Sequence, residues 1–203
     1  HRREVVRLLG VAVRGATLFF RGTSYGLDAG DSASEAVRAT LATLLPTIYA
    51  RFAESPHRLA NDEAAVKAAL AGTTANADLQ ALGVYRGDGT LNEGHALLSA
   101  LKGRLPLAEL DQGAITATAL RDEFERPPFG WDGNAVKVGL ALLLRASACR
   151  LIENSRTFTD PADPEVTQLL TRDARFRGLR VQGVQADLPV ATLMAIRGYL
   201  ETI

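Results

Sequence analysis

Apolar and polar positions recur along the chain with the period of a helix more often than with that of a strand. Residues 4–14 carry apolar side chains at helical spacing, and Gly15 is placed to end that helix. An apolar run at 17–21 predicts a short strand. The stretch 22–31 is rich in glycine and aspartate, so we expect it to be a loop.

A further helix begins after Ser32, which forms a capping-box pattern with Glu35. Its apolar side chains follow at intervals of three or four and make one stripe, formed by Val37, Leu41, Leu44, Ile48 and Phe52. Pro46 lies inside this helix, where proline removes an amide donor and crowds the preceding turn. We therefore expect a kink or a break near Leu45.

The middle of the chain predicts shorter helices. Asn61 or Asp62 is expected to cap one of them. Thr90 and Glu93 form another capping-box pattern, which predicts a helix at 93–102.

The sharpest pattern lies at 113–161. Thr116 is a good N-cap for a short helix, and Asp132 is a good N-cap for a long apolar helix. The residues between the two helices favour a turn, and they include Pro127, Pro128, Gly130 and Trp131. Short apolar segments around Asn154 and Ser155 predict a β-hairpin. The order helix, turn, helix, hairpin is typical of a winged-helix module.

The predicted fold class is mainly α, in three segments. They are a helical N-terminal subdomain at 1–112, a winged-helix-like module with a short β-hairpin at 113–161, and a C-terminal helical extension at 162–203. The first boundary rests on the stretch 105–112, which contains a proline and has no clear period.

The C-terminal extension is expected to begin with a short helix after Pro164. Irregular or extended chain should follow through 172–185. A last amphipathic helix is then predicted by the spacing of Leu193, Ile196 and Leu200.

Composition narrows the function classes. The 23 basic and 23 acidic residues give a formal net charge of zero, which removes the long-range field expected of a nucleic-acid coat or a polybasic membrane-surface protein. The one cysteine, Cys149, cannot form an internal disulfide. No apolar run approaches the ~20 residues that a membrane-spanning helix needs. We expect a cytoplasmic chain that makes no membrane contact, and the first residue, His1, indicates a segment of a longer protein.

Searches for catalytic patterns give no positive signal. The P-loop pattern G-x-x-x-x-G-K-[ST] does not occur, and the glycines at 87–89 are interpreted as a turn. His57 and His95 lack the spacing of metal ligands, so no metal site or cofactor is assigned. Asp28 and Asp31 are not assigned as an acid–base pair, and Asp31, next to Ser32, is interpreted as a capping or turn residue. We therefore expect no enzymatic activity from this segment.

Two residues at the centre of the predicted module are assigned structural roles. Cys149 follows an apolar helix and is expected to be inert core. Trp131 is expected to close the core between the two helices rather than to stack on a base or a ligand.

Nucleic-acid binding stays open as an alternative. The long apolar helix after Asp132 offers few polar side chains to read bases, which favours a helix buried on two sides in a protein-docking module. However, residues 172–180 hold four arginines around Phe176, and such a patch can clamp a phosphate backbone. The candidate backbone contacts are Arg150, Arg156, Arg172, Arg175, Arg177 and Arg180.

Three short segments resemble the large P-loop ATPase family of BREX phage-exclusion systems, the BrxC/PglY-like proteins. The first is Pro127-Pro128-Phe129-Gly130-Trp131 followed by Asn134-Ala135-Val136 and an apolar helix. The second is Leu82-Gly83-Val84-Tyr85 with Asp88-Gly89-Thr90-Leu91-Asn92. The third is Leu193-Met194-Ala195-Ile196-Arg197-Gly198-Tyr199-Leu200.

The resemblance implies a multidomain bacterial ATPase that excludes phage DNA together with a methyltransferase and other components. The Walker lysine does not occur in this sequence, so no catalytic residue is carried over and the chain would be a noncatalytic scaffold segment. Its partners would be other BREX components or other domains of the parent protein, with nonspecific DNA contact as an addition. The alternative function is a winged-helix DNA-binding transcriptional regulator, and a small-molecule enzyme is the least favoured class.

Overall fold

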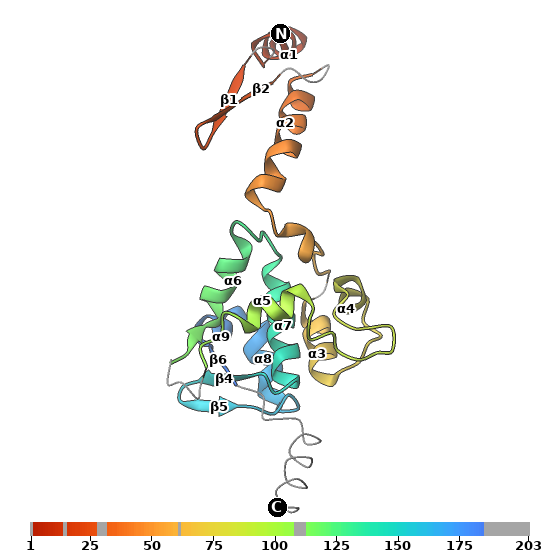
Figure 1. Ribbon diagram of the computed structural model, residues 1–203, viewed down its shortest axis with the longest axis vertical. Coiled ribbons are helices and arrows are strands. Elements are labelled where there is room, and N and C mark those ends of the chain that lie inside the picture. The colour runs from red at the N-terminus through yellow and green to blue at the C-terminus, as the bar shows by residue number, and fades with distance from the viewer. Residues whose placement is uncertain (1, 14–15, 28–31, 61, 108–112, 185–203) are drawn as a thin grey trace, which may run out of the picture. The chain divides into compact units, whose positions relative to one another are not determined.

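The computed structural model in Figure 1 describes all residues except 1, 14–15, 28–31, 61, 108–112 and 185–203. In its described residues the chain is mainly helical, with nine α-helices and two small antiparallel sheets. It divides into two compact units, unit 1 at residues 1–52 and unit 2 at 53–203.

Unit 1 consists of two helices and a β-hairpin. In chain order its elements are α1 (Arg2–Val13), β1 (Thr17–Phe20), β2 (Thr23–Gly26) and α2 (Ala33–Ile48). The expected helix and first strand are confirmed, but the expectation of a loop throughout 22–31 is wrong, because β2 pairs antiparallel with β1. Arg21 and Gly22 both adopt positive φ between the strands, as a two-residue hairpin turn requires.

The capping box at the start of α2 is confirmed. The backbone N–H of Glu35 donates to Oγ of Ser32, and the backbone N–H of Ser32 donates to the Glu35 carboxylate at 3.0 Å. The sequence predicted a kink or a break near Leu45, and the helix is not broken there, because it continues through Pro46 to Ile48. Pro46 lies in the last turn of α2, and the helix ends two residues after it.

Unit 2 holds the other regular elements of the described residues. They are a 3₁₀ turn that begins at the unit boundary, η1 (Phe52–Glu54), the helices α3 (Asp62–Ala71), α4 (Ala77–Leu82), α5 (Ala96–Lys102), α6 (Ala117–Glu125), α7 (Gly133–Arg145), α8 (Pro164–Thr171) and α9 (Asp173–Gly178), and the strands β3 (Ile115–Thr116), β4 (Cys149–Glu153), β5 (Arg156–Phe158) and β6 (Arg180–Gly183).

The predicted order of helix, turn, helix and hairpin is present as α6, α7, β4 and β5. Thr116 Oγ1 accepts from the backbone N–H of Ala119, and Asp132 Oδ1 accepts from that of Asn134, so both predicted N-caps are confirmed. Asn154 and Ser155 adopt positive φ in the two-residue turn between β4 and β5.

The expectation of irregular or extended chain through 172–185 is partly wrong. The short helix α9 contradicts it, whereas the strand β6 is extended chain, as expected, and lies inside a four-stranded antiparallel sheet of order β3-β6-β4-β5. Val181 of β6 is opposite Ile115 on one side and Leu151 on the other. Four residues are too few to show a period, so this strand depends on partners distant in the sequence.

The predicted start of the helix at 93–102 is also wrong. α5 begins at Ala96, and Nδ1 of His95 accepts from the backbone N–H of Leu97 at 3.3 Å. The capping-box pattern fails because Thr90 is used elsewhere: its backbone N–H and its hydroxyl both donate to Oδ1 of Asp88 in the preceding turn.

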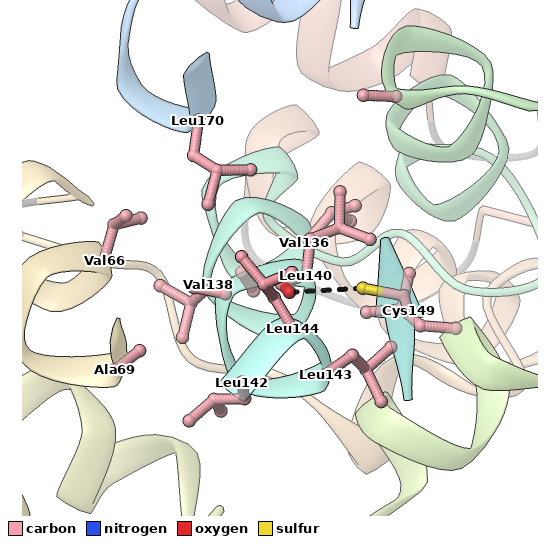
Figure 2. Close-up of a cluster of buried hydrophobic side chains, with 14 of the residues drawn as sticks. Val66, Ala69, Val136, Val138, Leu140, Leu142, Leu143, Leu144, Cys149 and Leu170 are labelled. Carbon is pink, nitrogen blue, oxygen red and sulfur yellow. Dashed lines mark hydrogen bonds between the residues drawn. The ribbon is translucent and has the colours of Figure 1, made fainter. Parts of the chain in front are cut away.

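The core of unit 2 surrounds α7. Eleven residues of this helix are buried, and in Figure 2 its side chains point to several sides, toward Val66 and Ala69 of α3, Leu170 of α8 and Cys149 of β4. Gly139 has no side chain to hold α5 away, since a Cβ there would lie 2.3 Å from Leu101. The buried core runs from Leu59 to Val181 and so includes parts of all three predicted segments.

Three features proposed from the sequence lie outside the described residues. They are the amphipathic helix with Leu193, Ile196 and Leu200, the pair Asp28 and Asp31, and most of the predicted boundary segment, at 108–112. Within the described residues, the helices are all too short or too polar to cross a membrane.

Candidate interaction surfaces

The polar side chains of α7 are used inside unit 2. Lys137 is 5% exposed, and its ammonium group lies 3.1 Å from Asp62 of α3 and 3.5 Å from Asp173 of α9. Arg145 donates from Nη1 to the backbone carbonyl of Leu70 at 2.9 Å. Lys137 is withdrawn from the surface, and Arg145, although exposed, holds α3 from the last turn of α7. With eleven of its residues buried, α7 lacks the open polar face that a base-reading helix needs.

The ring of Phe176 packs beside the ammonium group of Lys137. The ring is fully buried, and it lies 5.7 Å from the Lys137 ammonium and 5.8 Å from the Arg121 guanidinium. Cations at this distance from an aromatic ring are attracted to it. The expected alternative, Phe176 in the core rather than in an aromatic clamp, is what the structure shows.

Arg156, a candidate DNA contact, lies at the tip of the hairpin and is held by acidic side chains. Its guanidinium donates to Glu165 at 2.5 Å and to Asp163 at 2.9 Å, both at the start of α8. It also lies 4.4 Å from the centre of the Phe158 ring. This arginine fastens the hairpin to α8.

Arg175, the second candidate in this region, belongs to the same network. It bonds to Glu153 of β4 and, at 3.0 Å, to Glu165 of α8. The hydrogen bonds from Arg175 lower the pKa of both glutamates, and Arg156 adds to the effect on Glu165. The network of two arginines with Glu153, Asp163 and Glu165 carries more negative than positive groups, so the hairpin edge is not electropositive.

The other four candidates divide into two kinds. Arg150 donates from Nε and Nη2 to the side-chain oxygen of Gln182, which crosslinks β4 and β6. Arg172, Arg177 and Arg180 are exposed, and Arg180 reaches the carbonyl of Ala114 at 3.4 Å. Within the described residues, three of the six arginines therefore lie on the surface and make no ion pair with an acidic side chain.

The turn between α6 and α7 forms an aromatic cluster. Trp131 is 2% exposed, and its ring stacks on Phe124 with 5.2 Å between centroids. Phe129 meets both rings edge-on at 4.6 and 4.8 Å. Pro127, Pro128 and Gly130 shape the chain here, and Gly130 adopts a φ of 67°. Trp131 thus lies in the core, as expected, and not at a contact surface.

Unit 1 carries the large exposed apolar side chains of the part of the chain that the structure describes. Each of the nine large apolar side chains that are exposed in the described residues belongs to it: Val5, Leu8, Leu9, Val11, Phe19, Val37, Leu41, Leu45 and Phe52. Among these, Phe19 at the β-hairpin is 76% exposed. Three of them, Val37, Leu41 and Leu45, line one face of α2. An exposed apolar patch of this kind is typical of a site that binds another protein.

The buried part of unit 1 is correspondingly small. Its buried apolar residues in the described part of the chain are Leu27, Ala36 and Leu44. The apolar stripe predicted on α2 is divided, because Leu44 is buried while Val37 and Leu41 are about 40% exposed. The spacing of apolar residues predicts an apolar helix face, but it does not show whether the rest of the chain covers that face. The exposed apolar surface of α2 could therefore not be predicted from the sequence.

No catalytic arrangement emerges from the described residues. They contain no group of three or more His, Cys, Asp or Glu side chains able to hold a metal ion. Burial raises the pKa of the Cys149 thiol to about 12, so it stays protonated and unreactive. The glycine cluster at 87–89 is a turn, as expected, closed by a bond from Gly89 N–H to the Arg86 carbonyl.

Comparison of the chain with models of protein families, with curated proteins and with solved structures gives no match.

Proposed function

We propose that this chain is a noncatalytic interaction segment of a BREX-type ATPase, in which unit 1 binds another protein or another domain of the parent. The observation that carries the proposal is the distribution of apolar surface. Unit 1 exposes nine large apolar side chains and buries three apolar residues among its described positions. A unit of about 50 residues with so small a core is marginal on its own, so a partner surface would supply the missing burial.

Unit 2 fits the role of a rigid support. Helix α7 is enclosed by α3, α5, α6 and α8, and the pairs of Lys137 and Arg145 tie it to its neighbours. In this proposal the order α6, turn, α7, hairpin forms a winged-helix-like docking module in the cytoplasm. The burial of α7 argues against the alternative of a transcriptional regulator that reads bases with this helix.

Contact with DNA enters as a minor addition. Arg172, Arg177 and Arg180 are exposed and could neutralise phosphates, and nothing about them would select a base sequence. The BREX assignment itself rests on the resemblance of the three short segments named above. The chain departs from that family in lacking the Walker lysine, which is why the proposed role is noncatalytic.

A binding experiment with purified proteins tests the proposal. The chain would be titrated against the separately produced ATPase core of the parent, against the methyltransferase of the same system, and against an unrelated protein of similar size. We expect one of the first two to bind, and Leu9→Asp on α1 to weaken that binding at least ~30-fold, as loss of a central interface side chain does. The matched control is Thr43→Asp, at an exposed position of α2 away from its apolar stripe. Equal failure of both system components to bind would refute the proposal.

A further inference from the structure

The exposed face of helix α2 carries one cation among its apolar side chains. A shallow groove runs along this face and is lined by Ser34, Val37, Arg38, Leu41, Ala42 and Leu45. The three large apolar residues of the groove are between 40 and 46% exposed, whereas Ala36, Thr40 and Leu44 on another face of the helix are buried. Arg38 is therefore part of the open apolar groove and does not lie on a separate polar face.

Arg38 has no acidic partner within the described residues. Its side chain is exposed and makes no ion pair there. The two acidic side chains of unit 1 that the structure describes are both engaged elsewhere. Glu4 accepts from the guanidinium of Arg7 at 2.6 Å, and Glu35 accepts from the backbone N–H of Ser32 at 3.0 Å. The described part of unit 1 thus supplies no counter-charge to the groove.

Unit 1 as a whole is cationic. Residues 1–52 contain seven arginines and no lysine, against four acidic residues. A surface with an excess of positive charge attracts an acidic partner and disfavours a basic one. The charge of Arg38 and the charge of the unit around it therefore select the same kind of partner.

We propose that the groove on α2 binds an amphipathic helix whose apolar stripe is flanked by aspartate or glutamate, and that Arg38 pairs with one of these carboxylates. The inference rests on the proposed function, because Val37, Leu41 and Leu45 belong to the partner surface of unit 1, and it names the chemistry of that partner. An amphipathic helix binds a groove through its apolar face. Burial of the aliphatic side chains supplies affinity, and the charge pair selects the partner.

The residue types in the groove favour a protein over a nucleic acid or a membrane. Its large side chains are aliphatic, so they cannot stack on bases as aromatic side chains do. A helix that lies in a membrane interface carries several basic residues on its polar face. Arg38 is the one basic residue in the sequence of α2.

Two synthetic helical peptides of equal length test the charge preference of the full 203-residue chain. Both peptides carry a leucine stripe, which is flanked by glutamates in one peptide and by lysines in the other. Fluorescence anisotropy should show at least ~10-fold tighter binding of the glutamate peptide, because Arg38 attracts this peptide and repels the other. Binding of the glutamate peptide should weaken as the salt concentration rises, since salt screens exposed charges.

Reversal of the charge at position 38 makes the test specific to this residue. Arg38→Glu should lose the preference for the glutamate peptide and bind the lysine peptide at least as tightly. The matched control is Arg177→Glu, which makes the same change in net charge at an exposed position of unit 2 and should keep the wild-type preference. Leu41→Gln should weaken binding of both peptides, because it removes apolar contact without a change in charge. Circular dichroism checks that the variants fold.

Equal affinity for the two peptides, or a preference that Arg38→Glu leaves unchanged, would overturn the inference. Phosphatidylserine vesicles and a DNA duplex are the further probes. If one of them binds the wild-type chain and not Arg38→Glu, while the glutamate peptide does not bind, the groove belongs to a membrane or to a nucleic acid instead.

The proposed function can fail separately from this inference. It is tested by the titrations with the ATPase core and the methyltransferase, in which Arg38→Glu is included beside Leu9→Asp. A component that binds the wild type and Arg38→Glu equally well would leave the function standing and overturn the acidic helix. Preference for the glutamate peptide without binding of either component would support the acidic helix and refute the function.

Discussion

The ammonium group of Lys137 lies 3.1 Å from the carboxylate of Asp62, 75 residues earlier in the chain. Lys137 is in the middle of the central helix α7, and Asp62 is the first residue of α3. This ion pair, with Asp173 of α9 at 3.5 Å, joins three helices around a side chain that is almost completely buried. The buried cation therefore serves the packing of unit 2 and is withdrawn from any outside partner.

Removal of the negative partner Asp62 should cost more stability than removal of the buried cation Lys137, because the carboxylates left behind are partly exposed to water. Asp62→Asn leaves Lys137 buried with one carboxylate, and we expect the free energy of unfolding to fall by about 1–3 kcal/mol, less than for a fully buried pair because Asp62 is itself one-third exposed. Lys137→Met should stay within about 1 kcal/mol of the wild type, since an apolar side chain of similar length needs no counter-charge.

Chemical denaturation measures both variants. The control is Lys67→Met, which removes a cation from an exposed i,i+4 pair with Glu63 and should change stability by less than about 0.5 kcal/mol. A large loss of stability in Lys137→Met together with none in Asp62→Asn would contradict this account of the pair.

Trp131 should be essential to the stability of unit 2. Its ring is buried against Phe124 and Phe129, so Trp131→Ala removes apolar burial and leaves a cavity, at a typical cost of about 3–5 kcal/mol. Phe19→Ala, at a ring that is 76% exposed, is the control and should have little effect. Thermal unfolding followed by circular dichroism compares the two.

Fluorescence gives a separate check, because the chain has a single tryptophan. The wild-type protein should emit at short wavelength and resist quenching by iodide. Solvent-like emission would show that Trp131 is exposed and that the aromatic cluster is not formed.

The ion network at the hairpin should make stability sensitive to acid. Arg175 lowers the pKa of Glu153 and Glu165 in the folded chain. Such carboxylates stabilise the fold above the ordinary glutamate pKa of about 4.3, and this contribution is lost as the pH falls through their lowered folded values.

Melting temperatures of wild type and Arg175→Gln between about pH 2 and pH 7 test this dependence. We expect Arg175→Gln to melt lower at neutral pH and the difference to disappear in acid. Arg177→Gln, an exposed neighbour on α9, is the control and should follow the wild type at every pH. A constant difference across the range would show that Arg175 acts by packing alone.

Local signals in the sequence predicted much of unit 2. Thr116 and Asp132 cap their helices as expected, because an N-cap depends on the side chain and the next two or three residues. Asn154 and Ser155 likewise carry their turn locally. The residues of β6 were expected only as irregular or extended chain, and their place in a sheet was not predicted, because the pairing with β3 and β4 joins residues that are distant in the sequence.

The candidate interaction sites were predicted less well than the helices, because they depend on contacts between residues that are distant in the sequence. Four arginines within 172–180 suggested one basic patch, but Arg175 is taken by Glu153 and Glu165, and the latter is ten residues away. The exposed face of α2 was visible as a stripe, yet whether Leu41 is covered depends on how the rest of unit 1 folds. Residue types alone therefore do not show which arginines are held by acidic side chains and which are accessible to a partner, because that depends on the tertiary contacts.

The isolated chain should neither bind nor hydrolyse ATP. A phosphate cradle requires glycine-rich backbone amides and a lysine, and this combination does not occur in the sequence. Isothermal titration calorimetry with Mg-ATP measures the affinity of the chain for the nucleotide. A dissociation constant below about 10 µM would contradict the prediction and indicate a phosphate-binding site that has no recognisable sequence motif.

Binding to DNA should be weak, indifferent to sequence and strongly dependent on salt. Arg172, Arg177 and Arg180 are the exposed candidates, and three phosphate contacts predict a slope of log K against log salt no steeper than about −3. Replacement of all three by alanine should abolish the residual affinity.

The matched control is the double replacement Arg156→Ala and Arg175→Ala, whose guanidinium groups are already bound by carboxylates, and it should change the affinity for DNA little. Fluorescence anisotropy with two unrelated duplexes at about 50 and about 200 mM salt separates the cases. If the chain prefers one duplex and still binds it at the higher salt concentration, the result would favour the alternative of a DNA-binding transcriptional regulator. Contacts to phosphates are weakened by salt and do not distinguish sequences, whereas contacts to base edges do.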